Sequence, residues 1–178
     1  MTRNKMDAIE AIKTRRSVTV YKDKEVEPEK LLTCLDAARW APSAGNRQPW
    51  EFVVVTSDET RRKLAGVHPY ARFVAKAPVA LVFVANPSNS QVTHAIDTSL
   101  AAQNFMLAAH ALGLGTCWAG VYGTNLETPI KGVLGIPKEL RVLCLMSVGY
   151  PGESPSKDRV PLDQLTHWEK YGQRERPR

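Results

Sequence analysis

Residues 41–50 read APSAGNRQPW and separate a helical pattern from an apolar run at residues 52–55. Pro42 and Pro49 stiffen the two ends of this segment, because the proline ring fixes the backbone φ angle. Between them lie side chains that form hydrogen bonds, namely Ser43, Asn46, Arg47 and Gln48. Such a loop between a helix and a strand is a common place for binding residues, and an ordinary well-made turn is the alternative.

Outward from this loop, helical patterns alternate with apolar strand patterns. Helices are predicted at residues 7–14, 28–40, 59–65, 94–112 and 126–134. Strands are predicted at residues 51–56, 79–85, 116–120 and 141–148. The run at 51–56 is almost continuously apolar, which predicts burial of both its faces. The alternation indicates one α/β or α+β domain over residues 1–178.

Three segments need separate predictions. The segment 94–112 is apolar nearly all round, which is typical of a helix buried on every side. In a chain of this size, we therefore expect a second subunit to cover part of it. A weak helix or irregular structure is predicted for residues 67–76. This segment either covers a site or fills the core. After the last strand we expect an extended arm to Asp163 and a final helical turn at 167–171.

The composition is that of a globular protein, with 43% hydrophobic and 24% charged residues. The first residues, MTRNKMDAIE, lack the apolar core of a signal peptide, so a cytosolic protein without a membrane span is expected. The cysteines lie among apolar residues and predict buried reduced thiols: Cys34, Cys117 and Cys144. The four histidines have no metal-binding spacing, so no metal is predicted.

The formal net charge of +6 is compatible with nucleic acid, with anionic ligands or with no specific partner. Arg15, Arg16 and Ser17 follow the first helix, and two guanidinium groups with a hydroxyl could hold a phosphate. A basic helix end favoured by the helix dipole is the alternative. The chain contains no GxGxxG, GxxxxGK[ST] or GxSxG motif, which removes the main support for Rossmann, P-loop and hydrolase folds.

Taken in order, several segments resemble the nitroreductase family of FMN-dependent flavoproteins. They are RRS at 15–17, APSAGNRQPW at 41–50, DTSLAAQNFMLAAHALGLGTCWAG at 97–120, LGIP at 134–137 and VGYP at 148–151. The resemblance implies an α+β, three-layer α-β-α sandwich with a central, mostly antiparallel sheet. It also implies an intertwined homodimer with two FMN sites at the interface, each built by both subunits.

The implied reaction takes hydride from NADH or NADPH onto FMN and passes electrons to nitroaromatics, quinones or similar small molecules in a ping-pong cycle. The resemblance assigns the FMN phosphate end to Arg15, Arg16, Ser17 and Arg159. It assigns the flavin contacts to Pro42, Ser43, Asn46, Gln48, Trp118, Ala119 and Gly120. At Trp118, Ala119 and Gly120, a backbone N–H can donate a hydrogen bond to flavin N5. No catalytic side chain is expected, because FMN carries the chemistry.

One position departs from the family, which often has RRSxR where this chain has Thr19. We expect weaker phosphate binding, or compensation by Arg159 or a nearby lysine. An alternative function keeps the fold but performs reductive dehalogenation or flavin metabolism. A further alternative is a non-catalytic flavin-binding protein or a basic nucleic-acid-binding protein, which only the positive charge supports. Nucleic acid and membranes are not among the expected partners.

Overall fold

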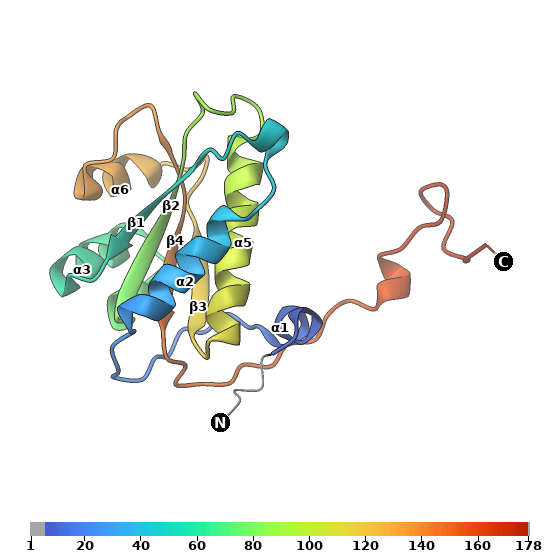
Figure 1. Cartoon of the computed structure of the whole chain (residues 1–178), viewed down its shortest axis with the longest axis horizontal. Helices are drawn as coiled ribbons and strands as arrows, with labels where there is room; N and C mark the ends of the chain where they lie inside the picture. Colours follow the sequence, from blue (N-terminus) through green and yellow to red (C-terminus); the bar gives the residue numbers. More distant parts are fainter. Residues whose placement is uncertain (1–5, 178) are drawn as a thin grey trace.

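A four-stranded antiparallel sheet forms the middle layer of the computed structural model, which describes residues 6–177 (Figure 1). Its strands are β1 (Trp50–Val55), β2 (Val79–Ala85), β3 (Gly115–Gly120) and β4 (Arg141–Gly149), in the order β1-β2-β4-β3. All three pairings are antiparallel, as the resemblance implied. Both central strands consist almost wholly of buried residues, which explains their continuous apolar sequences.

The prediction that residues 51–56 are covered on both faces is wrong. The strand β1 lies at an edge of the sheet, and its Glu51 and Val54 are exposed. Its apolar sequence matched that of the central strands β2 and β4. The position of a strand within the sheet depends on pairing across the fold, so a continuous apolar run did not distinguish an edge from a centre.

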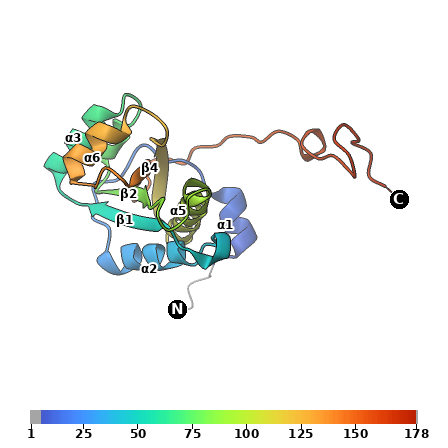
Figure 2. The ribbon, with the colours of Figure 1, turned by 90° about the horizontal axis from the view of Figure 1, so that it is seen from above.

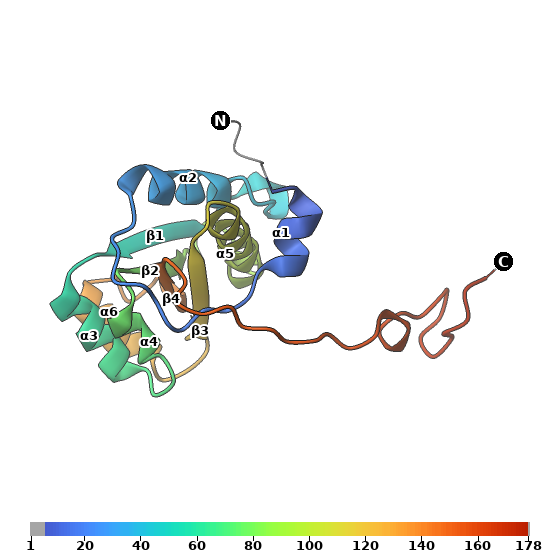
Figure 3. The same ribbon diagram turned by 90° about the horizontal axis from the view of Figure 1, so that it is seen from below.

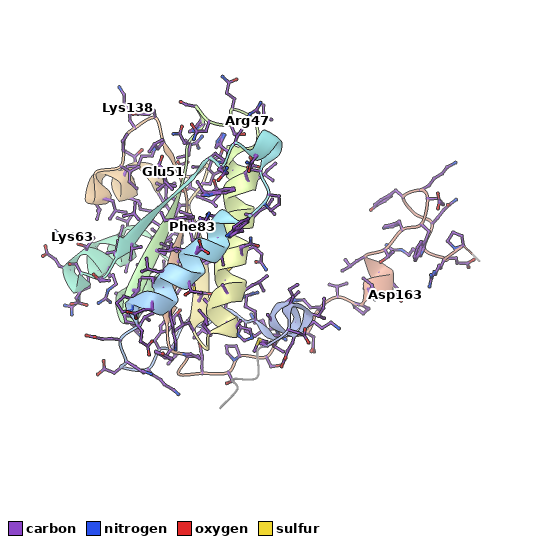
Figure 4. The ribbon with its side chains drawn as sticks, viewed as in Figure 1. Arg47, Glu51, Lys63, Phe83, Lys138 and Asp163 are labelled. Carbon is purple, nitrogen blue, oxygen red and sulfur yellow. The ribbon has the colours of Figure 1, made fainter. Side chains whose placement is uncertain are left out.

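Helices cover both faces of the sheet and complete the three layers (Figures 2 and 3). One layer contains α1 (Ala8–Thr14), α2 (Pro28–Arg39) and α5 (His94–Ala111), and the other contains α3 (Asp58–Val67), α4 (Phe73–Lys76) and α6 (Glu127–Leu134). Phe83, labelled near the centre of Figure 4, packs edge-on against Phe105 in the core beneath α2 and α5. A second core beneath α3 and α6 contains Leu64, Val82 and Ile130.

Local signals in the sequence explain where the helices begin and end. The Asp7 carboxylate accepts a hydrogen bond from the Glu10 N–H at 2.8 Å and caps α1. The Ser57 hydroxyl similarly caps α3. Gly135 ends α6 in the left-handed conformation, with φ of 66°, where glycine lacks the usual steric penalty. Within 67–76, Val67 ends α3, α4 is the one further helical segment, and the fully buried Val74 fills the core.

Two glycines allow residues 17–22 to cross one end of the sheet. Gly115 of β3 and Gly149 of β4 are register partners there. A Cβ atom on Gly115 would lie 2.9 Å from Val18, and one on Gly149 would lie 2.6 Å from Pro78. The Val18 N–H donates to the Thr116 carbonyl at 2.9 Å. This close crossing fixes Arg15, Arg16 and Ser17 beside the beginning of β3.

Beyond Pro151 the chain leaves the body as the expected arm (Figures 1 and 2). The helical turn predicted at 167–171 is wrong, because the arm has its turn at Leu162–Gln164. The Trp168 N–H instead donates to the Gln173 carbonyl at 2.7 Å, which closes a loop rather than a helical turn. All three cysteines are buried and free, as predicted. Within residues 6–177 no helix is long and apolar enough to cross a membrane.

Candidate functional site

A small cavity of about 160 Å³ opens beside the arginines that follow α1. Its lining includes Arg15, Arg16, His110 and Thr116. The Arg16 guanidinium folds back over the end of α1, and its Nη1 donates to the Lys13 carbonyl at 2.7 Å. Its Nε is buried and has no hydrogen-bond partner in the described part of the chain. A buried donor without a partner is costly in a finished site, so an acceptor from a ligand fits here.

Two arginines and His110 line this cavity together with one carboxylate, that of Glu153. Burial lowers the pKa of Arg15, and the nearby positive charges of Arg159 and Arg16 lower it further. Burial, followed by the charges of Arg15 and Arg16, also lowers the pKa of His110. The charge of Arg159, 143 positions after Arg16 in the sequence, thus acts on Arg15, but Arg159 does not line the cavity and its guanidinium donates to two carbonyls of the arm itself. A dianionic phosphate would relieve this repulsion.

Thr19 has a role that the sequence did not reveal. Its N–H and its hydroxyl donate to the Glu153 Oε1 at 2.7 and 3.0 Å, and the Val20 N–H donates to the same oxygen at 3.1 Å. These hydrogen bonds lower the pKa of Glu153 and anchor the beginning of the arm that carries Arg159. Thr19 and Glu153 are 134 positions apart, so no local pattern could have indicated the contact.

The strand β3 connects this cluster to the other predicted flavin contacts. Ser17 forms a parallel bridge with Thr116 near the beginning of β3, whereas Trp118, Ala119 and Gly120 form its end. Six strand residues span roughly 17–20 Å, a distance that suits an elongated ligand with a phosphate at one end. A Cβ atom on Gly120 would meet only the Trp118 Nε1, at 3.5 Å. The packing of this chain therefore does not itself require glycine at position 120.

The loop at 41–50 is a strained polar turn around η1 (Ala44–Asn46). Gly45, Asn46 and Gln48 all have left-handed backbone angles, with φ of 58°, 55° and 46°. The Gln48 N–H donates to the Ser43 Oγ at 3.0 Å, while the Pro42, Asn46 and Gln48 side chains lie at the surface. Left-handed residues other than glycine are concentrated at functional sites, which favours a binding loop over an ordinary turn.

Within one chain, this loop does not join the residues along β3. Asp97 in the first turn of α5 accepts hydrogen bonds from the Ala44 N–H at 3.4 Å and from the Thr93 hydroxyl at 2.8 Å. The loop thus lies beside the beginning of α5, and this helix separates it from β3 (Figure 3). His110, near the opposite end of α5, lines the arginine cavity. The predicted site residues therefore form two separate groups in the protomer.

A larger cavity lies elsewhere. It measures about 600 Å³ and is lined by the segment 21–26, Arg61 and the end of α4. Acidic and basic side chains alternate along the segment 21–26, and none of the predicted flavin residues reaches this cavity. Across residues 6–177, no three histidine, cysteine or acidic side chains are placed to hold a metal ion.

Sequence reasoning missed His68, which follows α3. Its Nε2 lies 3.0 Å from the carbonyl oxygen of Gly120, at the end of β3. A single histidine after a helix carries no sequence signal of such a contact, because 52 residues separate the two partners.

Comparisons with known proteins identify the family of this chain. The family model "Nitroreductase family" matches residues 12–68 and 65–150. A protein of Methanothermobacter thermautotrophicus, whose name pairs NADH dehydrogenase with NAD(P)H nitroreductase, is 41% identical over 94% of this chain and 90% of its own length. The FMN-dependent nitroreductase structure from Clostridium difficile is 34% identical, with a TM-score of 0.84 over 92% of this chain and 99% of that one.

The NADPH:FMN oxidoreductase of Vibrio harveyi, solved in complex with NAD+, is 27% identical. Its TM-score is also 0.84, and the match covers 93% of this chain and 78% of that one. The family match extends from the end of α1 to the end of β4, so it includes the arginine pair, the loop at 41–50 and β3. The chain therefore belongs to the nitroreductase family.

Proposed function

We propose that the protein is an FMN-dependent oxidoreductase that takes hydride from NADH or NADPH and reduces nitroaromatics, quinones or similar acceptors in a ping-pong cycle. The observation that carries this proposal is the pair Arg15 and Arg16, which line a cavity at the beginning of β3, with the charge of Arg159 acting on Arg15. The names of the relatives, which include FMN reductases and NAD(P)H nitroreductases, support the choice of cofactor and electron donor.

The residues of the chain fit FMN at both ends of β3. The arginine cluster would bind the phosphate, and the unpartnered Nε of Arg16 would gain an acceptor. Trp118, Ala119 and Gly120 would lie against the ring, where backbone N–H groups can donate hydrogen bonds. The amides of Asn46 and Gln48 carry both donors and acceptors and can match the polar edge of the ring.

Bound FMN supplies the hydride chemistry, so the protein needs no acid–base pair of its own. The side chains have three tasks: they bind the phosphate, orient the ring and exclude water from it. A cation or N–H donor near the pyrimidine edge would raise the tendency of the flavin to accept electrons.

The protein acts as a homodimer in this proposal. Ile96 and Leu100 of α5 are 62% and 40% exposed, and Leu162 of the arm is 78% exposed. Exposed apolar side chains grouped on a central helix and on a projecting arm favour burial by a second copy. Because α5 separates the loop at 41–50 from β3, the loop of the partner subunit would complete each flavin site.

A direct test begins with the purified protein and FMN. We expect a yellow protein that loses its colour when NADH or NADPH is added without oxygen and regains it with a nitroaromatic or quinone. Steady-state rates at several acceptor concentrations should give the parallel double-reciprocal lines of a ping-pong cycle. A colourless protein that cannot be reconstituted with FMN would contradict the proposal.

Comparing FMN with riboflavin, which lacks the phosphate, tests the arginine cluster. We expect Arg15→Gln to weaken FMN binding by about 10- to 100-fold, because a hydrogen bond to a charged group is lost. Riboflavin binding should change little. Arg62→Gln is the control, since this exposed arginine of α3 pairs with Asp58 at 2.7 Å and removes the same charge elsewhere. An equal loss of affinity for FMN and for riboflavin in Arg15→Gln would argue against a phosphate at Arg15.

A further inference from the structure

His68 connects two segments through one buried imidazole ring. The residue is 6% exposed and lies between α3 and α4. Its Nε2 is 3.0 Å from the Gly120 carbonyl oxygen, and its Nδ1 is 3.2 Å from the Tyr70 backbone nitrogen. The ring therefore ties the turn after α3 to the last residue of β3.

The partners determine where the imidazole carries its proton. The Tyr70 N–H can only donate, so Nδ1 must accept and carries no hydrogen. In the neutral ring the hydrogen is then on Nε2, which donates to the Gly120 carbonyl. Both nitrogen atoms are used, and the tautomer follows from the backbone around the ring.

This contact restrains a peptide group that glycine leaves comparatively free. The Val121 N–H, on the other side of the same peptide, donates to the Leu143 carbonyl at 3.0 Å. The peptide between Gly120 and Val121 is thus held by β4 through its N–H and by His68 through its carbonyl. Without a Cβ atom, Gly120 would otherwise sample a wider range of backbone angles.

We propose that His68 is a positioning residue that holds the end of β3 in the conformation that binds the flavin ring. The inference rests on the proposed function, because it assumes that Gly120 contacts FMN. Without the His68 donor, only a fraction of the molecules has the binding conformation at Gly120. Apparent FMN affinity then falls by that fraction, although His68 itself need not touch the flavin.

Three substitutions separate the two hydrogen bonds. His68→Gln keeps an N–H donor near the position of Nε2, so it can still reach the Gly120 carbonyl. His68→Asn keeps an acceptor for the Tyr70 N–H but is too short to reach Gly120. His68→Phe keeps the ring and loses both contacts. Ile130→Val of α6 is the control, because it weakens the same core without touching Gly120.

Two measurements test the proposal, one without and one with the cofactor. Hydrogen exchange of the Val121 amide in FMN-free protein should be faster in His68→Asn and His68→Phe than in wild type or His68→Gln. FMN affinity, measured by fluorescence quenching, should fall by about three- to tenfold in the same two variants, the range expected for one lost hydrogen bond. His68→Gln should stay within about twofold of wild type.

The results that would overturn the proposal are specific. Unchanged exchange and unchanged FMN affinity in His68→Asn and His68→Phe would show that the tether does not position Gly120. Equal losses of FMN affinity in all three His68 variants and in Ile130→Val would show that His68 has a purely structural role. Failure of the proposed function is distinguishable, because wild-type protein would then not bind FMN even if the exchange of Val121 depended on His68.

Discussion

At the scale of single residues, the backbone angles of the loop at 41–50 support the proposal that this loop binds a ligand. Asn46 and Gln48 have left-handed φ angles of 55° and 46°, which cost most residues about 1 kcal/mol relative to glycine. Asparagine tolerates this conformation better than most residues, and the neighbouring Ser43 and Gln48 hold the turn through a hydrogen bond of 3.0 Å. The sequence identified these residues as polar, and the structure shows that they are also strained.

Two substitutions at Asn46 separate the amide from the backbone strain. Asn46→Gly removes the amide without strain, whereas Asn46→Ala also places alanine at a left-handed position and should cost about 1 kcal/mol of stability. If the amide contacts the flavin, both variants should bind FMN equally weakly, while only Asn46→Ala melts at a lower temperature. Calorimetry and FMN titration measure the two effects. Wild-type affinity in Asn46→Gly would rule out a role for the amide.

The carboxylate of Glu27 gives a prediction of acid sensitivity. It accepts hydrogen bonds from the Tyr150 hydroxyl at 2.6 and 2.8 Å, which lower its pKa to about 2, with further help from Lys30 and Lys24. A lowered folded-state pKa stabilises the protein fully above the ordinary value of 4.5, and this contribution disappears as the pH falls towards about 2.

We therefore expect wild type to melt at a higher temperature than Glu27→Gln near neutral pH. The difference should shrink between pH 4.5 and about 2, where the carboxylate becomes protonated. Melting curves of both proteins over this range provide the measurement. A difference that stays constant with pH would show that the charge of Glu27 is not what stabilises this corner.

At the scale of elements, the site depends on where residues 15–22 cross the sheet. The glycines Gly115 and Gly149 leave room for Val18, Pro78 and Tyr21. In the sequence, Gly115 follows the helix predicted at 94–112, and Gly149 belongs to the VGYP segment. The structure gives them a second reason, because side chains from distant segments occupy the space where their Cβ atoms would be.

The substitution Gly115→Ala tests this crossing. Its Cβ atom would lie 2.9 Å from Val18, so the segment carrying Arg15 and Arg16 must move. We expect a loss of about 1–3 kcal/mol in stability and weaker FMN binding. The double variant Gly115→Ala, Val18→Ala removes the close contacts with the two Val18 Cγ atoms but leaves the one with its Cβ atom, so it should recover part of the FMN affinity. No recovery would mean that the crowding at Val18 does not set the position of the arginines.

At the scale of the whole molecule, the two groups of site residues would come from two subunits of the proposed dimer. The helix α5 is about 27 Å long and separates the loop at 41–50 from β3. Its exposed Ile96 and Leu100 and the projecting arm leave apolar surface uncovered in the protomer. In the proposed dimer a second copy would bury this surface and bring the loop to the flavin, which would couple assembly to cofactor binding.

A charge introduced on α5 tests this coupling. Ile96→Asp places a carboxylate at a position that the dimer would bury, so the mass in solution should fall from twice 19.7 kDa to 19.7 kDa. FMN affinity should fall with it. Light scattering and FMN titration report both changes. Lys138→Asp is the control, because this exposed residue lies on the side of the molecule away from the arm (Figure 4). A dimeric Ile96→Asp that binds FMN normally would contradict the coupling.

By itself the sequence determined the helices and strands of the body, the family and the arginine pair. These features depend on local periodicity, caps and short motifs, which a chain carries whatever its tertiary contacts. Only the tertiary structure decided that β1 is an edge strand, that Thr19 anchors Glu153 and that His68 reaches Gly120. Each of these pairings links residues far apart in sequence, and their meeting depends on how the layers pack. The loop at 41–50 was recognisable as polar from its residues, but its separation from β3 follows from the position of α5 between them.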